Sequence, residues 1–244
     1  MDTITKYFGI IALLATMLLV SGCGNTYVVK DTNLNTISVT GSSDLSSAPD
    51  QVQITVAVET SSTTAKQAKD QNAKTLDSVR RALKAKGIAD DDMETAYFNI
   101  RPDHEWNREL EKNELIGYTA TQTLRVTSRD ITKAGDIIDT AVNAGANSIG
   151  SIVFGLTKET QSEVNNKALE AAALKAQEKA KALAKTLDVN IGKVVSISES
   201  NTEFFAYTPP VARLAMAEDL AEKTVISPGD VSTTGQVSIS FEIV

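Results

Sequence analysis

The chain alternates between two hydrophobic periodicities, and the order in which they follow one another constrains its fold more than any other feature. Strands buried on one face repeat apolar residues every two positions, whereas amphipathic helices repeat them about every 3.6 positions. The patterns occur in the order strand 52–58, helix 64–86, strands 95–101 and 118–127, a helix from Asp130 to about Gly145, and strand 148–156. This β-α-β-β-α-β order predicts a split βαβ sheet with helices on one face.

A long third helix and further strands extend this core. Thr160 and Glu163 have the spacing of a capping box, and apolar residues, mostly alanines, then repeat at helical spacing as far as Leu187. Alanine on that face would let the helix lie close to a sheet. Further strand patterns cover 37–41, 194–198 and 235–244. The sequence therefore predicts one α+β domain over 37–244, with a mixed or antiparallel sheet, a long third helix and C-terminal strands.

Two segments do not follow this periodicity. Residues 102–114 form a charged connection that we expect to be a long exposed hairpin loop, and residues 201–223 are irregular in pattern. Aromatic residues in these segments are Trp106, Phe204, Phe205 and Tyr207. Exposed aromatic side chains are enriched at protein interfaces, so these four are candidate interface residues. The alternative is that they fold back over the edge of the sheet.

Residues 1–22 are predicted to be a signal peptide and not part of the fold. Residues 7–20 are uncharged and almost wholly apolar. This length matches a signal-peptide core of about 7–15 residues, whereas the alternative, a membrane-spanning helix, needs about 20. The run ends in the tetrapeptide VSGC at 20–23, which resembles a bacterial lipobox. That resemblance implies that the Cys23 thiol receives a diacylglyceryl group and that Cys23 becomes the new N-terminus.

We expect lipidated Cys23 to hold the mature chain on a membrane. A single acyl chain binds marginally and reversibly, but the lipobox resemblance implies two or three chains, which anchor a protein stably. Gly24 follows Cys23. By analogy with enterobacterial sorting, an aspartate at this position would favour retention in the inner membrane. In a cell with two membranes we therefore expect the outer membrane, facing the periplasm. Residues 23–36 are predicted to be the lipidated N-terminus and a flexible polar tether.

Composition excludes several classes of function. The net charge is −7, and removal of the signal peptide takes away one acid (Asp2) and one base (Lys6), which leaves it at −7. Without a basic stripe, we expect no nucleic-acid partner. Cys23 is the only cysteine, so after acylation no thiol remains for a disulfide, a metal site or a nucleophile. No cofactor is expected.

The strongest polar cluster for an enzyme hypothesis is Asp103-His104-Glu105, which contains the only histidine. In extended backbone neighbouring side chains point to opposite faces, so these three would not converge on one site. Catalytic and metal-binding roles need convergent partners. The sequence also lacks a G-x-S-x-G elbow, a phosphate-binding glycine loop and a paired-histidine metal motif. We therefore expect no enzyme activity and no metal site.

An ordered set of short segments resembles the SIMPL-domain family, which includes the periplasmic immunogenic protein. The segments are ISVTG at 37–41, GI at 87–88, DMET at 92–95 leading into YFN at 97–99, GY at 117–118, AGAN at 144–147 before Phe154, the alanine-rich helix 168–187, GKV at 192–194 and ISPG at 226–229. The resemblance covers nearly all of 37–244. It implies a location in the periplasm or on envelope membranes, ring-like oligomers in some relatives and a link with oxidative-stress tolerance in others. It supplies no established catalytic residues.

These observations leave two main hypotheses for function. In the first, the chain is an anchored envelope protein for interaction, assembly or stress tolerance, and self-association would use the aromatic segments. In the second, it is a small-molecule-binding envelope module, for which a thermal-shift screen against envelope metabolites is the discriminating experiment. An enzyme is the third and weakest hypothesis.

Overall fold

The computed structural model describes residues 35–209, 224 and 226–244. The predicted signal peptide, Cys23 and nearly all of the predicted tether lie outside these residues, as does the segment 210–223. Residues Thr36–Val244 form one compact unit.

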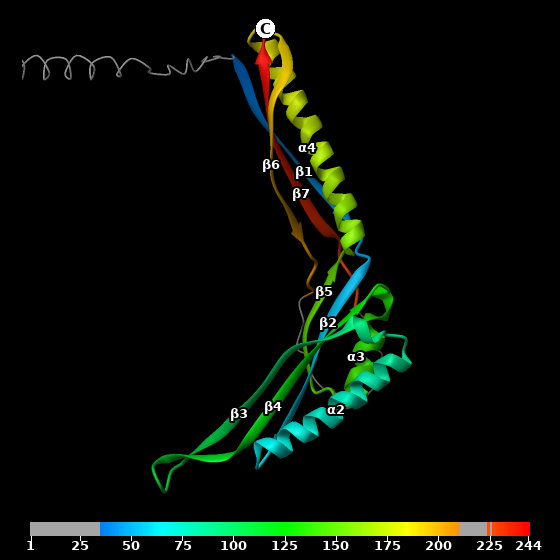
Figure 1. Ribbon diagram of the computed structural model, residues 1–244, viewed down its shortest axis with the longest axis vertical. Helices are drawn as coiled ribbons and strands as arrows, with labels where there is room; N and C mark the ends of the chain where they lie inside the picture. The colour runs from blue at the N-terminus through cyan, green and yellow to red at the C-terminus, as the bar shows by residue number, and fades with distance from the viewer. Residues whose placement is uncertain (1–34, 210–223, 225) are drawn as a thin grey trace, which may run out of the picture. The chain divides into compact units, whose positions relative to one another are not determined.

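Within the described residues, the strands form two antiparallel sheets, which confirms the predicted α+β class (Figure 1). The first sheet has the order β3-β4-β2-β5 and the second the order β1-β7-β6. The strands are β1 (Thr36–Ser47), β2 (Gln51–Ser62), β3 (Met93–Asn107), β4 (Lys112–Ser128), β5 (Ser148–Gly155), β6 (Ile191–Phe205) and β7 (Val231–Ile243). The terminal strands therefore do not extend the first sheet but build a second one with the third helix.

The first sheet has the predicted β-α-β-β-α-β order, as β2-α2-β3-β4-α3-β5. Helices α2 (Ala65–Ala85) and α3 (Ala134–Asn143) supply the core on one face of the sheet. Gly87 and Gly145, with φ of 90° and 113°, end these helices in the left-handed conformation that glycine adopts most easily. The core side chains include Val52, Ile54, Val56, Leu76, Val79, Leu83, Leu124, Val126, Ile137, Ile138 and Phe154.

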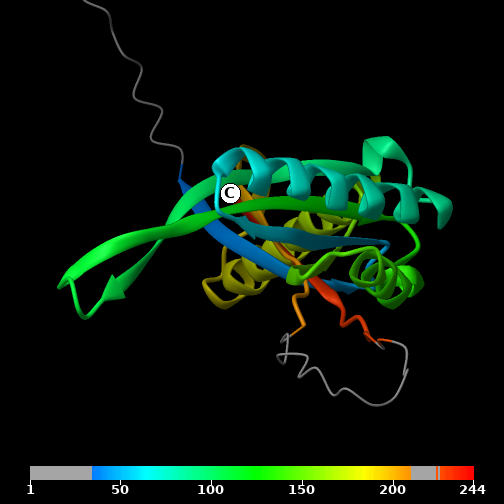
Figure 2. The ribbon, with the colours of Figure 1, turned by 90° about the horizontal axis from the view of Figure 1, so that it is seen from below.

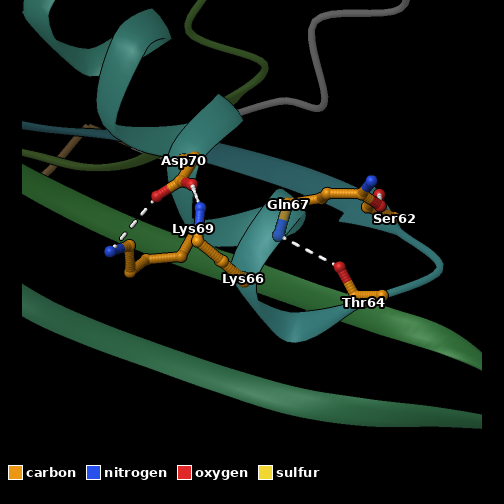
Figure 3. A network of polar contacts seen from close by, with 6 residues as sticks. All are labelled: Ser62, Thr64, Lys66, Gln67, Lys69 and Asp70. Carbon is orange, nitrogen blue, oxygen red and sulfur yellow. Dashed lines mark hydrogen bonds and ion pairs between the residues drawn. The ribbon is translucent and has the colours of Figure 1, made fainter.

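The start of α2 shows how local polar contacts define a helix end (Figure 3). The Thr64 hydroxyl accepts a hydrogen bond from the Gln67 backbone N–H at 3.3 Å, which satisfies one free donor of the first turn. The Gln67 side chain accepts from the Ser62 hydroxyl at 3.0 Å instead of returning to Thr64, so only half of a capping box forms. Lys66 in the first turn pairs with Asp70 in the second at 2.7 Å.

The second sheet is covered by the long helix α4 (Lys158–Thr186), which packs on β1 and β7. The buried face of α4 repeats alanine every four residues: Ala168, Ala172, Ala176, Ala180 and Ala184. The strands supply equally small partners, since a Cβ on Gly41 would lie 2.6 Å from the Ala176 nitrogen and one on Gly235 would lie 2.7 Å from the Ala168 carbonyl carbon. The predicted close approach of an alanine helix to a sheet is therefore present.

Asp50 links the two sheets at the point where the chain crosses between them. It follows β1 and immediately precedes β2, and its carboxylate accepts hydrogen bonds from the Thr157 N–H at 2.6 Å and from the Thr157 hydroxyl at 3.0 Å. The Thr160 hydroxyl donates a third bond at 2.5 Å. A carboxylate at the first turn of a helix also complements the helix dipole. Asp50 therefore fixes the start of α4.

Several predicted boundaries differ from the structure. Residues 102–114, expected to be a long loop, are mostly strand, because β3 continues to Asn107 and β4 starts at Lys112. Residues 201–205, expected to be irregular, belong to β6, and β1 continues to Ser47. The missed parts of β3 and β6 have two accessible faces, so their sequences need no alternation of apolar and polar residues. In β1 the burial does alternate, but the buried residue there is the polar Ser43, so the sequence carries no apolar period.

Helix α4 also differs from its prediction at both ends. It starts at Lys158, and Thr157 caps it by accepting from the Thr160 N–H at 3.4 Å, so the predicted start at Thr160 is three residues late. At the other end Leu183 and Leu187, expected on the buried face, are 43% and 64% exposed. The reason is that both lie to one side of the buried alanines, on the side of α4 where Lys179 reaches the Thr40 carbonyl of the edge strand β1.

Candidate functional site

The polar cluster around the only histidine does not converge on a site. Asp103 accepts a hydrogen bond from the Thr119 hydroxyl and pairs with Arg101 at 3.2 Å. His104 follows a register shift in β3, is paired in register with Leu115 and is exposed. Across the described residues, no group of three His, Cys, Asp or Glu side chains is arranged to hold a metal ion.

A surface hollow of about 460 Å³ lies between α2 and α3. Lys86, Asp136, Asp139, Thr140 and Asn143 contribute most of its lining. The Asp139 carboxylate already has partners within the chain, because it accepts hydrogen bonds from the Thr224 N–H at 3.2 Å and from the Thr224 hydroxyl at 2.6 Å. Small-molecule sites are typically concave and mostly apolar, and this hollow is instead polar.

The clearest candidate site is an apolar surface on the β3–β4 hairpin, beyond the start of α2. Figures 1 and 2 both show this hairpin continuing past the end of the helix. Its exposed apolar side chains, between 51% and 56% accessible, are Trp106, Leu110, Leu115 and Ile116, which we call the hairpin surface. A two-stranded ribbon without a covering layer cannot bury such side chains within its own fold.

A second exposed apolar surface lies where α4 is followed by β6. Val194 and Ile197 of β6 pair with Phe241 and Ile239 of β7, so each pair points to the same face. Yet Ile197 is 67% exposed and Ile239 only 6%. A helix about 10 Å wide covers about two strands spaced about 4.8 Å apart, and α4 covers β1 and β7. Most of strand β6 is left uncovered, although Ile191 at its start packs against the core beneath α4.

Two exposed leucines of α4 lie on the other side of the helix. Lys179, one turn before Leu183 on the same side of α4, donates a hydrogen bond to the Thr40 carbonyl of β1, so Leu183 and Leu187 lie on the side of β1 and not of β6. We call Val194 and Ile197 the β6 surface. The two apolar surfaces have different causes, because the hairpin continues beyond its covering helix, whereas β6 lies beside the two strands that α4 covers (Figure 1).

The four aromatic residues singled out in the sequence lie in two environments. Trp106 belongs to the hairpin surface, and Phe205 is 55% exposed. Phe204 is half-buried against the cluster of Leu156, Val164 and Val231. Tyr207 is half-buried as well and lies against Phe154, with ring centroids 6.3 Å apart. Phe204 and Tyr207 thus cover the core, while Trp106 and Phe205 remain accessible.

Tyr207 also continues the first sheet beyond β5. Its N–H donates to the Phe154 carbonyl at 3.0 Å, and its carbonyl accepts from the Phe154 N–H at 2.8 Å. Gly229 lies against the Tyr207 ring, since a Cβ there would approach the ring carbons to 2.6 Å. This tight packing gives the tyrosine a structural role at the edge of the sheet.

Sequence reasoning missed most of the two apolar surfaces. Leu110, Leu115 and Ile116 are the apolar residues of a charged segment, and that contrast with their neighbours was the available signal. Val194 and Ile197 carried no such signal, because their pattern is that of an ordinary half-buried strand. Cys23 lies outside the described residues, so its lipidation remains a prediction. Among the described helices, none combines the length and apolar composition needed to cross a bilayer.

The domain that carries both surfaces matches a known protein family. The family described as "SIMPL: Protein of unknown function (DUF541)" matches residues 37–241. The chain belongs to the SIMPL family. The match contains every strand that forms the hairpin surface and the β6 surface, so both are built from the SIMPL domain.

Relatives within the SIMPL family match most of the chain. The "26 kDa periplasmic immunogenic protein" of Brucella melitensis biotype 1 is 32% identical over 216 residues, which cover 85% of this chain and 84% of that protein. "Uncharacterized protein YggE" of Edwardsiella ictaluri is 28% identical over 198 residues, with coverage of 78% and 81%. YggE of Escherichia coli strain K12 is 26% identical over 214 residues, with coverage of 85% and 82%.

Proposed function

We propose that this SIMPL protein is a lipid-anchored component of the cell envelope that acts by assembling with other proteins, first of all with itself, and not by catalysis. The name of the Brucella relative as a periplasmic protein supports a location outside the cytoplasm. The VSGC tetrapeptide at 20–23 supports an anchor on Cys23. The observation that carries assembly is the hairpin surface, a set of exposed apolar side chains that includes a tryptophan.

The physical argument for assembly is the free energy available from burying this surface. Removing a large apolar side chain from water contributes roughly 1.5–3 kcal/mol. Binding energy at interfaces is concentrated in a few anchors, among which tryptophan is enriched. Trp106 and Leu110 lie at the end of the ribbon, where a partner can reach them without displacing another element of the fold. Self-association is the simplest way to bury them.

The test replaces Trp106 and Leu110 together with serine in a mature chain that carries Cys23→Ser and is therefore free of lipid. We expect the molar mass measured by light scattering to fall relative to the parent, with an apparent dissociation constant at least tenfold higher. Two exposed residues are removed and no buried contact is lost, so the circular dichroism spectrum should stay unchanged.

Leu174→Ser is the matched control, because Leu174 is 59% exposed on α4 but lies apart from both apolar surfaces. Its molar mass should equal that of the parent. If the Trp106/Leu110 variant keeps the parent's mass at every concentration, the hairpin surface is not used in assembly.

The anchor has its own test, which does not depend on assembly. Wild-type protein expressed with its signal peptide should incorporate labelled palmitate, whereas the Cys23→Ser variant should not, because Cys23 is the only thiol available for acylation. We expect the labelled protein to fractionate with the outer membrane of a cell with two membranes. Equal labelling of both forms would show that the lipid is not on Cys23.

A further inference from the structure

We propose that the end of the second sheet at which α4 finishes is a contact face for an anionic lipid surface. The face consists of Lys181, Lys185, Leu183 and Leu187 in the last two turns of α4, and we call it the lipid-contact end. The inference goes beyond the anchor on Cys23, because here the folded domain itself touches the membrane. It rests on the proposed anchor only for the way in which the domain is presented to that membrane.

The chain enters the domain at this same end. β1 begins at Thr36, which is paired in register with Glu242 near the end of β7. Ile191, the first residue of β6, is paired with Ile243, so the turn from α4 to β6 lies at the same end of the sheet as the start of β1 (Figure 1). Residues 23–35 separate the predicted lipid from this point and span at most about 45 Å. The anchor therefore keeps the lipid-contact end within that distance of the membrane.

Charge is distributed unevenly along the chain, and this end is basic. Residues 179–193 contain four lysines against one acid, Asp188, a net charge of +3 in a chain whose net charge is −7. Lys181 and Lys185 are exposed and have no ion-pair partner among the residues that the structure describes. An anionic surface therefore attracts this end and repels the rest of the domain, which orients the chain on the membrane.

A surface hollow of about 450 Å³ lies between the end of α4 and the start of β6. Lys181 and Lys185 line it together with the amide of Asn190, and Asp188 is the one acid in the lining. Lysine ammonium and amide groups both donate hydrogen bonds to phosphate oxygens. The hollow thus offers a place for the phosphate of a lipid headgroup at the basic side of the lipid-contact end.

Two exposed leucines give this end an apolar component. Leu183 and Leu187 are 43% and 64% exposed and lie on the β1 side of α4, whereas the two lysines lie on the β6 side, where they line the hollow. A broad surface that meets the last turn of the helix contacts both sides. Leucines then leave water for the headgroup region while the lysines stay among the phosphates, a combination that holds peripheral proteins at a membrane.

Vesicle binding by the lipid-free Cys23→Ser chain is the test, because without acyl chains only the protein surface can bind. At low salt we expect co-sedimentation with vesicles of phosphatidylethanolamine and phosphatidylglycerol, and binding at least tenfold weaker to phosphatidylcholine alone. Added salt should weaken the binding, because it screens the lysines. Equal binding to both kinds of vesicle, or none to the anionic ones, overturns the proposal.

Inorganic phosphate separates a lipid surface from a free anion as the partner of the hollow. At equal ionic strength it should displace the chain from anionic vesicles no better than chloride, because one ion replaces neither the many headgroups nor the contact of the leucines. Displacement by phosphate at concentrations where chloride has no effect would assign the hollow to free phosphate and contradict the lipid surface.

Two double variants locate the contact on α4. Lys181→Glu with Lys185→Glu should weaken binding to the anionic vesicles at least tenfold, because attraction becomes repulsion. Leu183→Ser with Leu187→Ser should weaken it at least threefold, because the apolar contact is lost. Both should keep the circular dichroism spectrum and the molar mass of the parent, since all four side chains are exposed. Unchanged binding by the lysine variant excludes this end as the contact.

The matched control reverses two lysines in the first half of the same helix, as Lys158→Glu with Lys167→Glu. Both are exposed, and the change in net charge equals that of the other lysine variant. Binding should stay within about twofold of the parent, because charge near the surface matters more than total charge. A loss as large as that of the Lys181/Lys185 variant would show that the attraction has no particular location.

A fluorescent label shows directly which part of the chain meets the lipid. Cys23 is the only cysteine, so Leu187→Cys, Lys167→Cys or Leu110→Cys in the Cys23→Ser chain each gives one labelling site. An environment-sensitive dye at Leu187→Cys should shift to shorter wavelength on anionic vesicles, and dyes at the other two sites should not. A shift on the hairpin alone, or equal shifts at all three sites, overturns the proposal. Palmitate labelling and molar mass test the proposed function separately, so either can fail without the other.

Discussion

Replacing Gly41 with alanine is expected to detach α4 from the second sheet. A Cβ at this position would lie 2.6 Å from the Ala176 nitrogen and 2.9 Å from the Ala176 Cβ, and closer still to the Ala172 carbonyl oxygen. These neighbours are helix backbone, which cannot turn aside as a flexible side chain can. The helix must therefore retreat from β1 and expose Val39, Val237, Ile239 and Phe241. We expect a loss of about 3 kcal/mol or more, the upper end of overpacking effects.

Urea unfolding measured by circular dichroism gives this loss directly, and Gly155→Ala is the matched control. A Cβ on Gly155 would meet only the Phe204 ring, at 3.9 Å, which is an ordinary contact. Gly155→Ala should therefore be neutral or stabilise the fold by up to about 1 kcal/mol, because alanine restricts the unfolded chain. Equal stability of the two variants would contradict the packing described for α4.

Replacing Asp50 with alanine is expected to have the second largest effect, a loss of about 2 kcal/mol at neutral pH. The substitution removes three hydrogen bonds to a charged acceptor and leaves the Thr157 N–H, at the start of α4, without its side-chain partner. A hydrogen bond to a charged group contributes about 1.5–3 kcal/mol net, and water can replace part of this at Asp50 because the residue is only half-buried. The exposed Asp91→Ala should change stability by less than about 0.5 kcal/mol.

The effect of Asp50 should depend on pH. Burial opposes its charged form, but hydrogen bonds from the Thr160 hydroxyl and from the Thr157 N–H and hydroxyl outweigh burial and hold the pKa of Asp50 below its ordinary value. A lowered pKa stabilises the fold above the unfolded-state pKa of about 3.9, and this contribution is lost as the pH falls through the folded-state pKa.

The measurement compares the unfolding free energies of wild type and Asp50→Ala from pH 7 down to about pH 3. The difference should be constant near neutrality and should shrink below about pH 4. A difference that stays the same across this range would mean that the Asp50 charge does not contribute to stability.

The elements with a buried face could be predicted from the sequence, and the exposed ones could not. The core of β2 and the whole of α2 follow from apolar residues that repeat at the period of their element, with Thr64 and Gly87 marking the ends of the helix. Burial forces that period, because a polar residue in the wrong register would lose its hydration. The hairpin and β6 have two accessible faces, so nothing forces their sequences to alternate.

The candidate surfaces could not be predicted in full from local sequence patterns, because these patterns do not contain the tertiary arrangement of the strands and helices. The sequence predicted that Leu183 and Leu187 would be buried, because they share a helical face with buried alanines. Their exposure depends on where the edge of the sheet lies beneath the helix, since they lie on the side of the edge strand β1, and that is a property of the tertiary fold. Trp106 was found because a tryptophan in a charged segment is conspicuous. Tyr207 was found for a similar reason, but its place against Phe154 depends on chain pairing that only the structure shows.

The molar mass of the lipid-free mature chain, measured by light scattering over a wide range of protein concentration, tests the central claim most directly. Assembly through the hairpin surface predicts masses at least twice that of one chain, which increase with concentration and decrease when Trp106 and Leu110 are replaced with serine. A single mass equal to that of one chain at every concentration would contradict the account.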